Sequence, residues 1–289
     1  MGTPVGMGMP RGMGMPGGFR MPGGRAGRAG GMGGIGLIVI ALIAIFLGVD
    51  PRFLFQGGPL PDPSYQERQS PPSPAEEELK EFMSVVLADT EDTWHGLFEQ
   101  LERTYQEPTV VLFSGAVDSA CGYANAAVGP FYCPGDRKVY LDLSFFQELG
   151  ERFGAPGDFA QAYVLAHEVG HHVQTLLGIS DQVRQVRATL SEADANALSV
   201  RQELQADCFA GIWASHADRM RQVLEPGDIE EGLRAASAIG DDRLQRQAQG
   251  YVVPESFTHG SSEQRMRWFE TGYSDGVLGA CDTFSADQL

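Results

Sequence analysis

The sequence predicts an α+β fold that is mostly helical, contains a small β-sheet and is preceded by one transmembrane helix. Apolar residues recur at helical spacing over most of residues 74–289, which we take as the folded domain. Two short runs rich in β-branched and aromatic residues, 110–113 and 138–143, interrupt that pattern and are predicted to be strands. An uncharged stretch at 29–49 is long enough to cross a bilayer at about 1.5 Å per residue.

The segment ahead of the domain divides into three parts. Residues 1–34 are rich in Gly, Met, Pro and Arg, cannot bury a core, and are predicted to be a disordered tail. The apolar run 35–49 is predicted to be an uncleaved membrane anchor, because no small-residue cleavage site follows it; a cleaved secretory signal is the alternative. The arginines before it predict a cytoplasmic tail and a domain outside the cytoplasmic membrane. Residues 50–73 are Pro-rich and are predicted to form a linker.

Charge is unevenly distributed along the chain. The whole sequence has 21 basic and 38 acidic residues, a net charge of −17. The first 49 residues contain four arginines and no acidic residue, so the remainder has 17 basic and 38 acidic residues. Phosphate binding needs clustered Lys and Arg, and we therefore expect no nucleic-acid partner.

The folded domain is expected to begin with a helix. Ser73 is a favourable N-cap, Pro74 suits the first turn and Glu76 completes a capping box. The helical spacing continues to about residue 105. The strands at 110–113 and 138–143 follow, separated by a loop rich in Gly, Cys and Pro.

The rest of the domain is predicted to be helical. Asp158 is expected to cap a helix that ends at Leu177, where Gly178 provides the stop signal. Ser261 begins the last helix, with Gln264 in the capping-box position. Further helices are expected at 144–153, 181–190, 191–223 and 228–247.

Four cysteines lie after the predicted anchor and predict two disulfides in an oxidising compartment. The sequence allows three connectivities. We favour Cys121–Cys133, because a short loop containing Gly and Pro joins them, and this leaves Cys208–Cys281. Free buried thiols are the alternative; zinc ligation by these cysteines is disfavoured because they include no C-x-x-C pair.

The sequence HEVGH at 167–171 carries the clearest chemical signal. His167 and His171 are four residues apart on a predicted helix, so both imidazoles share one face and can bind one zinc ion. Glu168 lies beside the first ligand, where it can take a proton from a zinc-bound water and pass it to the leaving amine. Apolar residues flank the motif, and burying such polar residues is costly unless they bind something. A polar helix that carries this pattern by chance is the alternative.

A catalytic zinc site usually has three protein ligands and one open position. The metzincin arrangement would require Gly and His at positions occupied by Gln174 and Leu177, so it is excluded. We expect Glu203 to be the third ligand. Asp207 lies four residues later on the same helix face and is expected to accept the free N–H of a ligating histidine. The alternative, a solvated acidic face, fits poorly with the apolar residues that follow Asp207.

A third candidate is His259, at the start of the last predicted helix. An imidazole there can stabilise the oxyanion that forms when water attacks a carbonyl. Arg265 can hold this segment in place through a carboxylate. A surface histidine is the alternative. The remaining histidines are expected to be structural or surface residues, namely His95, His172 and His216.

These segments, taken in order, resemble the bacterial neutral zinc metallopeptidase family, single-pass membrane proteins with an extracytoplasmic domain. The resemblance covers most of residues 74–285. Its motifs are GPFYCP at 129–134, VYLDLSFF at 139–146, HEVGHHVQ at 167–174, and the segments 203–211 and 258–265.

The ELQAD and THG sequences also resemble the wider gluzincin group. That resemblance implies a zincin-like fold, with Glu203 as the third zinc ligand, Asp207 supporting a ligand and His259 assisting the transition state. Gly260 departs from the wider group, in which proline is usual at this position.

We therefore expect a zinc metalloendopeptidase with one Zn²⁺ per chain, acting on polypeptides through a zinc-bound water activated by Glu168. It is expected to be anchored in the bacterial cytoplasmic membrane by residues 35–49. The strand at 139–143 is expected to form the sheet edge to which an extended substrate adds. One alternative is a zinc-stabilised, membrane-anchored binding or adaptor domain with little catalysis. A second alternative is a membrane scaffold whose function resides in the tail and the anchor.

Overall fold

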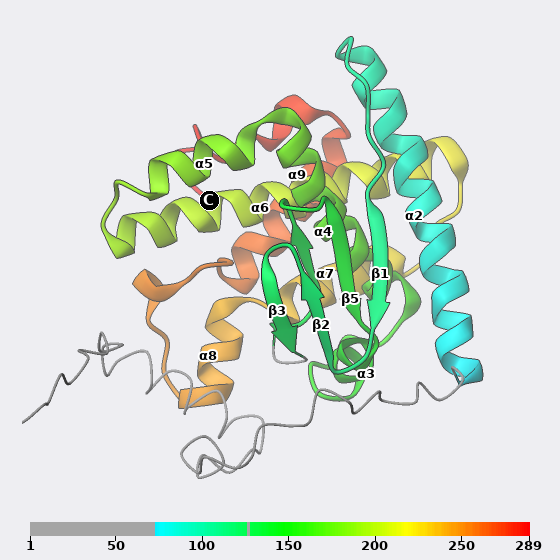
Figure 1. Ribbon diagram of the computed structural model, residues 1–289, viewed down its shortest axis with the longest axis horizontal. Coiled ribbons are helices and arrows are strands. Elements are labelled where there is room, and N and C mark those ends of the chain that lie inside the picture. Colours follow the sequence, from blue (N-terminus) through cyan, green and yellow to red (C-terminus); the bar gives the residue numbers. More distant parts are fainter. Residues whose placement is uncertain (1–72, 126–127) are drawn as a thin grey trace, which may run out of the picture. The chain divides into compact units, whose positions relative to one another are not determined.

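The computed structural model describes residues 73–125 and 128–289 (Figure 1). These residues form an α+β domain that is mostly helical with a small sheet, as predicted. The predicted tail (1–34) and anchor (35–49), and the predicted linker up to residue 72, lie outside the described residues. Within the part of the chain that is described, no helix has the length and apolar character needed to cross a membrane.

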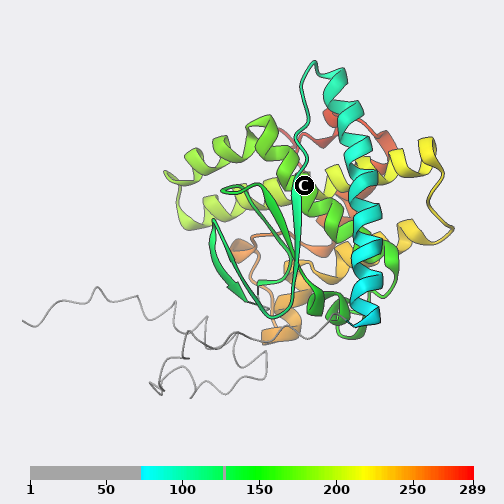
Figure 2. The same ribbon diagram turned by 45° about the vertical axis from the view of Figure 1, so that its right-hand side comes forward.

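The first described helix is α2 (Pro74–Gln100). Its capping box is as predicted: the Ser73 hydroxyl accepts from the Glu76 amide, and the Ser73 amide donates to the Glu76 carboxylate. The helix ends earlier than the predicted residue 105, because Glu102 adopts a left-handed conformation with φ of 56°. Helix α2 stands next to the sheet in both views (Figures 1 and 2) and also packs against α4 (Asp158–Leu177).

The main sheet has the order β1-β5-β4, formed by β1 (Thr109–Phe113), β5 (Lys138–Asp142) and β4 (Phe131–Cys133). Strand β1 runs parallel to β5, and β4 runs antiparallel to it. The prediction that residues 139–143 form the sheet edge is wrong, because β5 has a partner strand on each side. Strands β1 and β4 are the two edges of this sheet, and β4, which is only three residues long, is the one that the sequence pattern missed.

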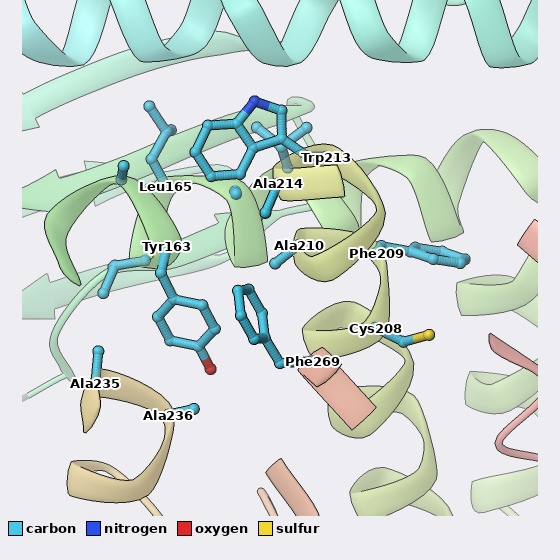
Figure 3. Close-up of a cluster of buried hydrophobic side chains, with 14 of the residues drawn as sticks. Tyr163, Leu165, Cys208, Phe209, Ala210, Trp213, Ala214, Ala235, Ala236 and Phe269 are labelled. Atoms are coloured by element: carbon cyan, nitrogen blue, oxygen red, sulfur yellow. The ribbon is translucent and has the colours of Figure 1, made fainter. Parts of the chain in front are cut away.

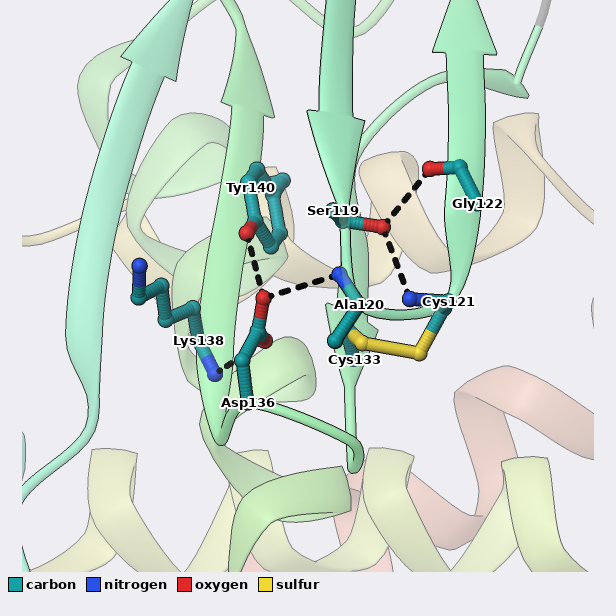
Figure 4. Close-up of a disulfide and its surroundings, with 8 residues drawn as sticks. All are labelled: Ser119, Ala120, Cys121, Gly122, Cys133, Asp136, Lys138 and Tyr140. Carbon is teal, nitrogen blue, oxygen red and sulfur yellow. Dashed lines mark hydrogen bonds between the residues drawn. A yellow bond between two sulfur atoms is a disulfide. The ribbon is translucent and has the colours of Figure 1, made fainter.

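A second, two-stranded sheet lies in the segment predicted to be a loop. Strands β2 (Ala116–Ser119) and β3 (Gly122–Asn125) form an antiparallel hairpin. The disulfide Cys121–Cys133 ties the turn of this hairpin to β4, which confirms the favoured pairing (Figure 4). The Asp136 carboxylate accepts from the Ala120 amide and the Tyr140 hydroxyl across the same junction. The edge strand is therefore held covalently and by hydrogen bonds.

The remaining helices follow the predicted order. They are α3 (Leu143–Glu151), α4, α5 (Ile179–Arg187), α6 (Glu192–His216), α7 (Asp228–Ala238), α8 (Asp241–Gln249) and α9 (Ser262–Asp275), with a π-helical turn at Ala217–Arg221 and short 3₁₀ turns at Pro254–Ser256 and Leu278–Cys281.

Besides the end of α2, other helix boundaries differ from the prediction: α3 and α5 are shifted by one to three residues at their ends, and three further differences concern other helices. Gly157, with φ of 124°, occupies the N-cap of α4, so Asp158 is its first helical residue and not its cap. The helix predicted at 191–223 ends as an α-helix at His216 and continues only as the π-helical turn. The helix predicted at 228–247 is two helices, because the backbone is extended at Gly240, with ψ of 141°. The start of α9 packs against this break: a Cβ at Gly240 would lie 2.4 Å from the Ser262 amide nitrogen.

Helices α4, α6 and α9 form the centre of the domain. Tyr163 of α4 and Phe269 of α9 meet edge to face in the core, with ring centroids 5.5 Å apart (Figure 3). Helices α6 and α9 cross closely, because Gly211 faces the Phe269 carbonyl and Gly272 faces the Cys208 carbonyl. This packing brings the middle of α6 and the first turn of α9 to one face of α4.

Candidate metal centre

Two helices supply the candidate metal ligands. Helix α4 presents His167 and His171 one turn apart, and α6 presents Glu203 opposite them. The Nε2 atoms of His167 and His171 lie 3.3 Å and 3.4 Å from the same Glu203 carboxylate oxygen. The structure therefore brings together the three residues that the sequence nominated as ligands.

Hydrogen bonds fix which nitrogen of each histidine faces the centre. His167 Nδ1 lies 2.8 Å from the Asp207 carboxylate, and His171 Nδ1 lies 2.9 Å from Gln174 Oε1. The amide of Gln174 is itself oriented, because its Nε2 donates to the Gln202 carbonyl. Both Nδ1 atoms therefore act as donors, and both Nε2 lone pairs point toward Glu203.

This donor set fits a zinc ion. Ligand atoms about 2.0–2.1 Å from a tetrahedral zinc lie about 3.3 Å from one another, which matches the distances between the imidazole nitrogens and Glu203. Two imidazoles and one carboxylate are also ligands that zinc prefers. Three acceptor atoms that converge in this way are unfavourable unless a positive charge lies between them.

The electrostatics of the site favour a positive charge. Burial lowers the pKa of the His167 imidazole, but the Asp207 and Glu203 carboxylates outweigh this effect and raise its pKa to about 9. Glu203 lies between both histidines, which hold the pKa of its carboxyl well below the usual range despite burial. The carboxylates thus stabilise either a proton or a metal ion at this point.

A buried hydrogen-bond network around Asp207 orients the candidate ligand His167. The Asp207 carboxylate accepts from Arg265 of α9 in a bidentate pair, with both N···O distances 2.9 Å, and also from the Tyr163 hydroxyl. Burial raises the pKa of Asp207, but Arg265 and His167 outweigh it and lower this pKa to about 2. The predicted hydrogen bond from His167 to Asp207 is present, and Arg265 pairs with a carboxylate as expected.

Glu168 and His259 both line the same cleft as the ligands, which has a volume of about 950 Å³. His259 is half exposed, and Asp241 holds it through its side chain and backbone: its Nδ1 lies 3.2 Å from one Asp241 oxygen, and the other oxygen accepts from the His259 and Gly260 amides. Burial lowers the pKa of His259, but the Asp241 hydrogen bond outweighs it and raises this pKa. Asp241 was not singled out from the sequence; its only signal is an acidic residue directly after Gly240 at a helix start.

The other histidines have structural partners, as expected. His172 is fully buried and lies 3.1 Å from the Tyr132 hydroxyl on the edge strand, away from the ligand group. His95 pairs with Glu107 on the surface, and His216 lies against a backbone carbonyl at the end of α9.

The fold and the site together define a class of protein. A histidine pair on one helix, a glutamate from a second helix and a further glutamate in the cleft are the residues of a candidate metal centre of the HExxH type with a distant glutamate. The chain belongs to the family described as "Putative neutral zinc metallopeptidase", whose model matches residues 11–284.

Similar proteins occur in distant bacteria. The chain is 52% identical over 242 residues to "Uncharacterized protein YpfJ" of Escherichia coli (strain K12), covering 84% of this chain and 83% of that protein. It is 41% identical over 261 residues to "Uncharacterized protein Rv2575" of Mycobacterium tuberculosis (strain H37Rv), covering 85% of this chain and 86% of that protein. These names assign no activity. No solved structure matches the chain significantly.

Proposed function

We propose that the protein is a zinc-dependent endopeptidase in which His167, His171 and Glu203 hold one zinc ion. The proposal is carried by one observation: three donor atoms converge with fixed orientation beside a free carboxylate in an open cleft. Bound zinc supplies Lewis acidity, which lowers the pKa of a water ligand and polarises a substrate carbonyl. The family description and its metallopeptidase class support the same assignment.

The remaining chemistry belongs to side chains of the cleft. Glu168 neighbours His167 and lines the cleft, so its carboxylate is placed to accept a proton from water and to return it to the leaving amine. His259 is placed to donate to the oxygen of the attacked carbonyl, since Asp241 orients its ring and favours the charged form. Asp207 keeps the His167 ring oriented.

The substrate we propose is an extended polypeptide that adds to β4. Among the described residues, β4 has β5 as its only partner strand, and residues 128–132 and 134 line the cleft. A peptide on this free edge gains main-chain hydrogen bonds, and its side chains reach the cleft walls. One end of that cleft is apolar and includes Phe145, Phe153 and Leu244.

We also propose that residues 35–49 anchor the chain in the cytoplasmic membrane, with the tail in the cytoplasm and the domain outside. Two disulfides support this location, since they persist in oxidising compartments. A reporter fused after residue 289, of a kind active only outside the cytoplasm, tests the orientation. Activity of the complementary, cytoplasm-only reporter at the same position would overturn it.

The catalytic proposal is tested with the full-length chain, loaded with zinc and given unfolded casein. Glu168→Gln should bind one zinc per chain and lose about 10²–10⁴-fold in kcat. Glu99→Gln, an exposed change on α2, is the matched control and should keep its activity. Equal inertness of zinc-loaded wild type and Glu168→Gln across many substrates would overturn the peptidase assignment in favour of a binding domain.

A further inference from the structure

The charged residues that line the cleft are mostly positive, whereas the chain as a whole is acidic. The whole sequence has 21 basic and 38 acidic residues, yet the charged residues that line the cleft are three arginines and two glutamates, namely Arg184, Arg187, Arg265, Glu168 and Glu203. Arg265 is buried and neutralised by Asp207, and Glu203 belongs to the metal site. The charges that remain for a substrate to meet are therefore mostly positive.

The two other arginines of the cleft, Arg184 and Arg187, lie on α5. Val183 is buried and fixes this helix against the domain, while Arg184 and Arg187 are exposed one turn apart. Arg184 pairs with Asp181 at 2.8 Å, but with 72% and 63% of these side chains exposed the pair is weak and can exchange partners. Arg187 makes no ion pair within the described part of the chain. Helix α5 lies beside α6, which carries Glu203 (Figure 1).

Polar side chains are part of the cleft lining near α5, where Thr175 and Gln202 contact the Ser180 hydroxyl. Thr175, Ser180 and Gln202 line the cleft near α5. The residues supplied by α3 and α8, such as Phe145 and Leu244, are apolar. The cleft thus has two ends of different chemistry, with the candidate ligands between them.

We propose that Arg184 and Arg187 form a subsite for acidic side chains, so that preferred substrates are polypeptides with Asp or Glu close to the scissile bond. This inference rests on the proposed function of the same cleft. The net negative charge of the domain disfavours acidic polypeptides in general, but at physiological ionic strength screening confines interactions between exposed charges to about 8 Å. Attraction of an acidic residue is therefore local to α5, where two guanidinium groups can pair with carboxylates.

The test measures binding without turnover. The full-length Glu168→Gln chain, loaded with zinc, is titrated with two fluorescent peptides that differ only in three Glu residues replaced by Gln. The selectivity is the ratio of their Kd values. The added substitutions Arg184→Gln and Arg187→Gln should reduce the selectivity for the acidic peptide about fivefold. Lys80→Gln with Arg103→Gln removes the same charge from the surface outside the cleft and should leave the selectivity unchanged.

The outcomes separate this inference from the peptidase assignment. Equal selectivity with and without the two arginines, or an equal loss in the surface control, overturns the acidic subsite. Wild-type cleavage sites without enrichment of Asp or Glu also overturn it, while leaving the peptidase assignment intact. Selective binding that depends on the arginines, combined with an inert wild type, supports the subsite and overturns the peptidase assignment.

Discussion

Asp207 is the residue on which the candidate centre depends most. Its carboxylate is fully buried and contacts His167 and Tyr163 of α4 and Arg265 of α9. It therefore orients a ligand and neutralises a buried guanidinium with the same two oxygens. A change at this residue should affect both metal binding and stability.

Asp207→Asn should weaken zinc binding about 10–100-fold, because the His167 ring loses its charged partner. It should also lower the free energy of unfolding by about 3–5 kcal/mol, since Arg265 stays buried without a counter-charge. Competition with a chromophoric chelator and denaturant titration measure the two effects. Asp275→Asn, an exposed change on α9, should alter neither; wild-type zinc affinity in Asp207→Asn would count against the supporting role.

The same carboxylate gives a pH dependence. The folded pKa of Asp207 is about 2, below its ordinary 3.8, so its stabilising contribution is complete above that ordinary value and is lost as the pH falls toward 2. The difference in stability between the metal-free wild type and Asp207→Asn should therefore shrink between pH 4 and pH 2. A difference that stays constant over this interval would contradict the lowered pKa.

Glu203→Ala should reduce zinc affinity by more than the roughly 10–100-fold expected for a supporting residue, because it removes a donor atom. Metal analysis of the purified full-length chain, with Glu192→Ala on the first turn of α6 as a control, measures this. Retention of full zinc affinity would remove Glu203 from the ligand set.

Side chains that share a helix face could be predicted from the sequence, whereas the amide and backbone contacts that orient them could not. The four-residue spacing of His167 and His171, and of Glu203 and Asp207, defines shared faces on predicted helices. Gln174 and Asp241 act on segments far away through amide and backbone contacts. Such contacts leave no periodic signal in the sequence.

At the scale of elements, the crossing of α6 and α9 determines whether the centre forms. A Cβ at Gly272 would lie 1.9 Å from the Cys208 carbonyl oxygen, so only glycine permits this approach. The crossing places Arg265 of α9 against Asp207 of α6. Separation of the helices would therefore also disturb the ligand face of α6.

Gly272→Ala should lower the free energy of unfolding by about 1–3 kcal/mol or more, since the two backbones must move apart. Gly96→Ala is the matched control: it lies in α2 with open space around it and should stabilise the protein by up to about 1 kcal/mol. Thermal unfolding of both variants tests the pair, and equal melting temperatures would contradict the close crossing.

Helix ends with side-chain caps and glycine stops were predictable, since their signals are local: the capping boxes at Ser73 and Ser261 and the stop at Gly178 are all present. The short strands were not, because β4 has three residues and lies between prolines. Its pairing with β5 depends on residues that meet only in the folded sheet. The sheet edge was consequently predicted at residues 139–143, which largely form β5, and β5 has a partner strand on each side.

At the scale of the whole molecule, two disulfides close loops of different length. Cys208–Cys281 spans 73 residues and joins α6 to the last 3₁₀ turn, whereas Cys121–Cys133 spans 12 residues. The longer loop restricts the unfolded chain more. Both pairings were predicted. Cys208–Cys281 was predicted only because it contains the two cysteines that remain once Cys121 is paired with Cys133.

Replacing Cys208 and Cys281 with alanine should lower the free energy of unfolding by about 4 kcal/mol, against about 3 kcal/mol for Cys121 and Cys133. Denaturant titration of the two double variants gives the comparison. Loop length predicts which double variant loses more free energy of unfolding better than it predicts the size of either loss. A larger loss for Cys121 and Cys133 would show that native packing around the shorter bridge outweighs the effect of loop length.

The position of Arg265 near the end of the chain has a consequence for timing. The ribosome completes α4, the helix that carries HEVGH and ends at Leu177, about 90 residues before it adds Arg265, whose guanidinium neutralises Asp207. Until α9 docks and Cys281 pairs with Cys208, α6 lacks both the contact of Asp207 with Arg265 and its disulfide. A chain that ends before α9 therefore holds an incomplete candidate centre, in which the Asp207 carboxylate has no guanidinium beside it.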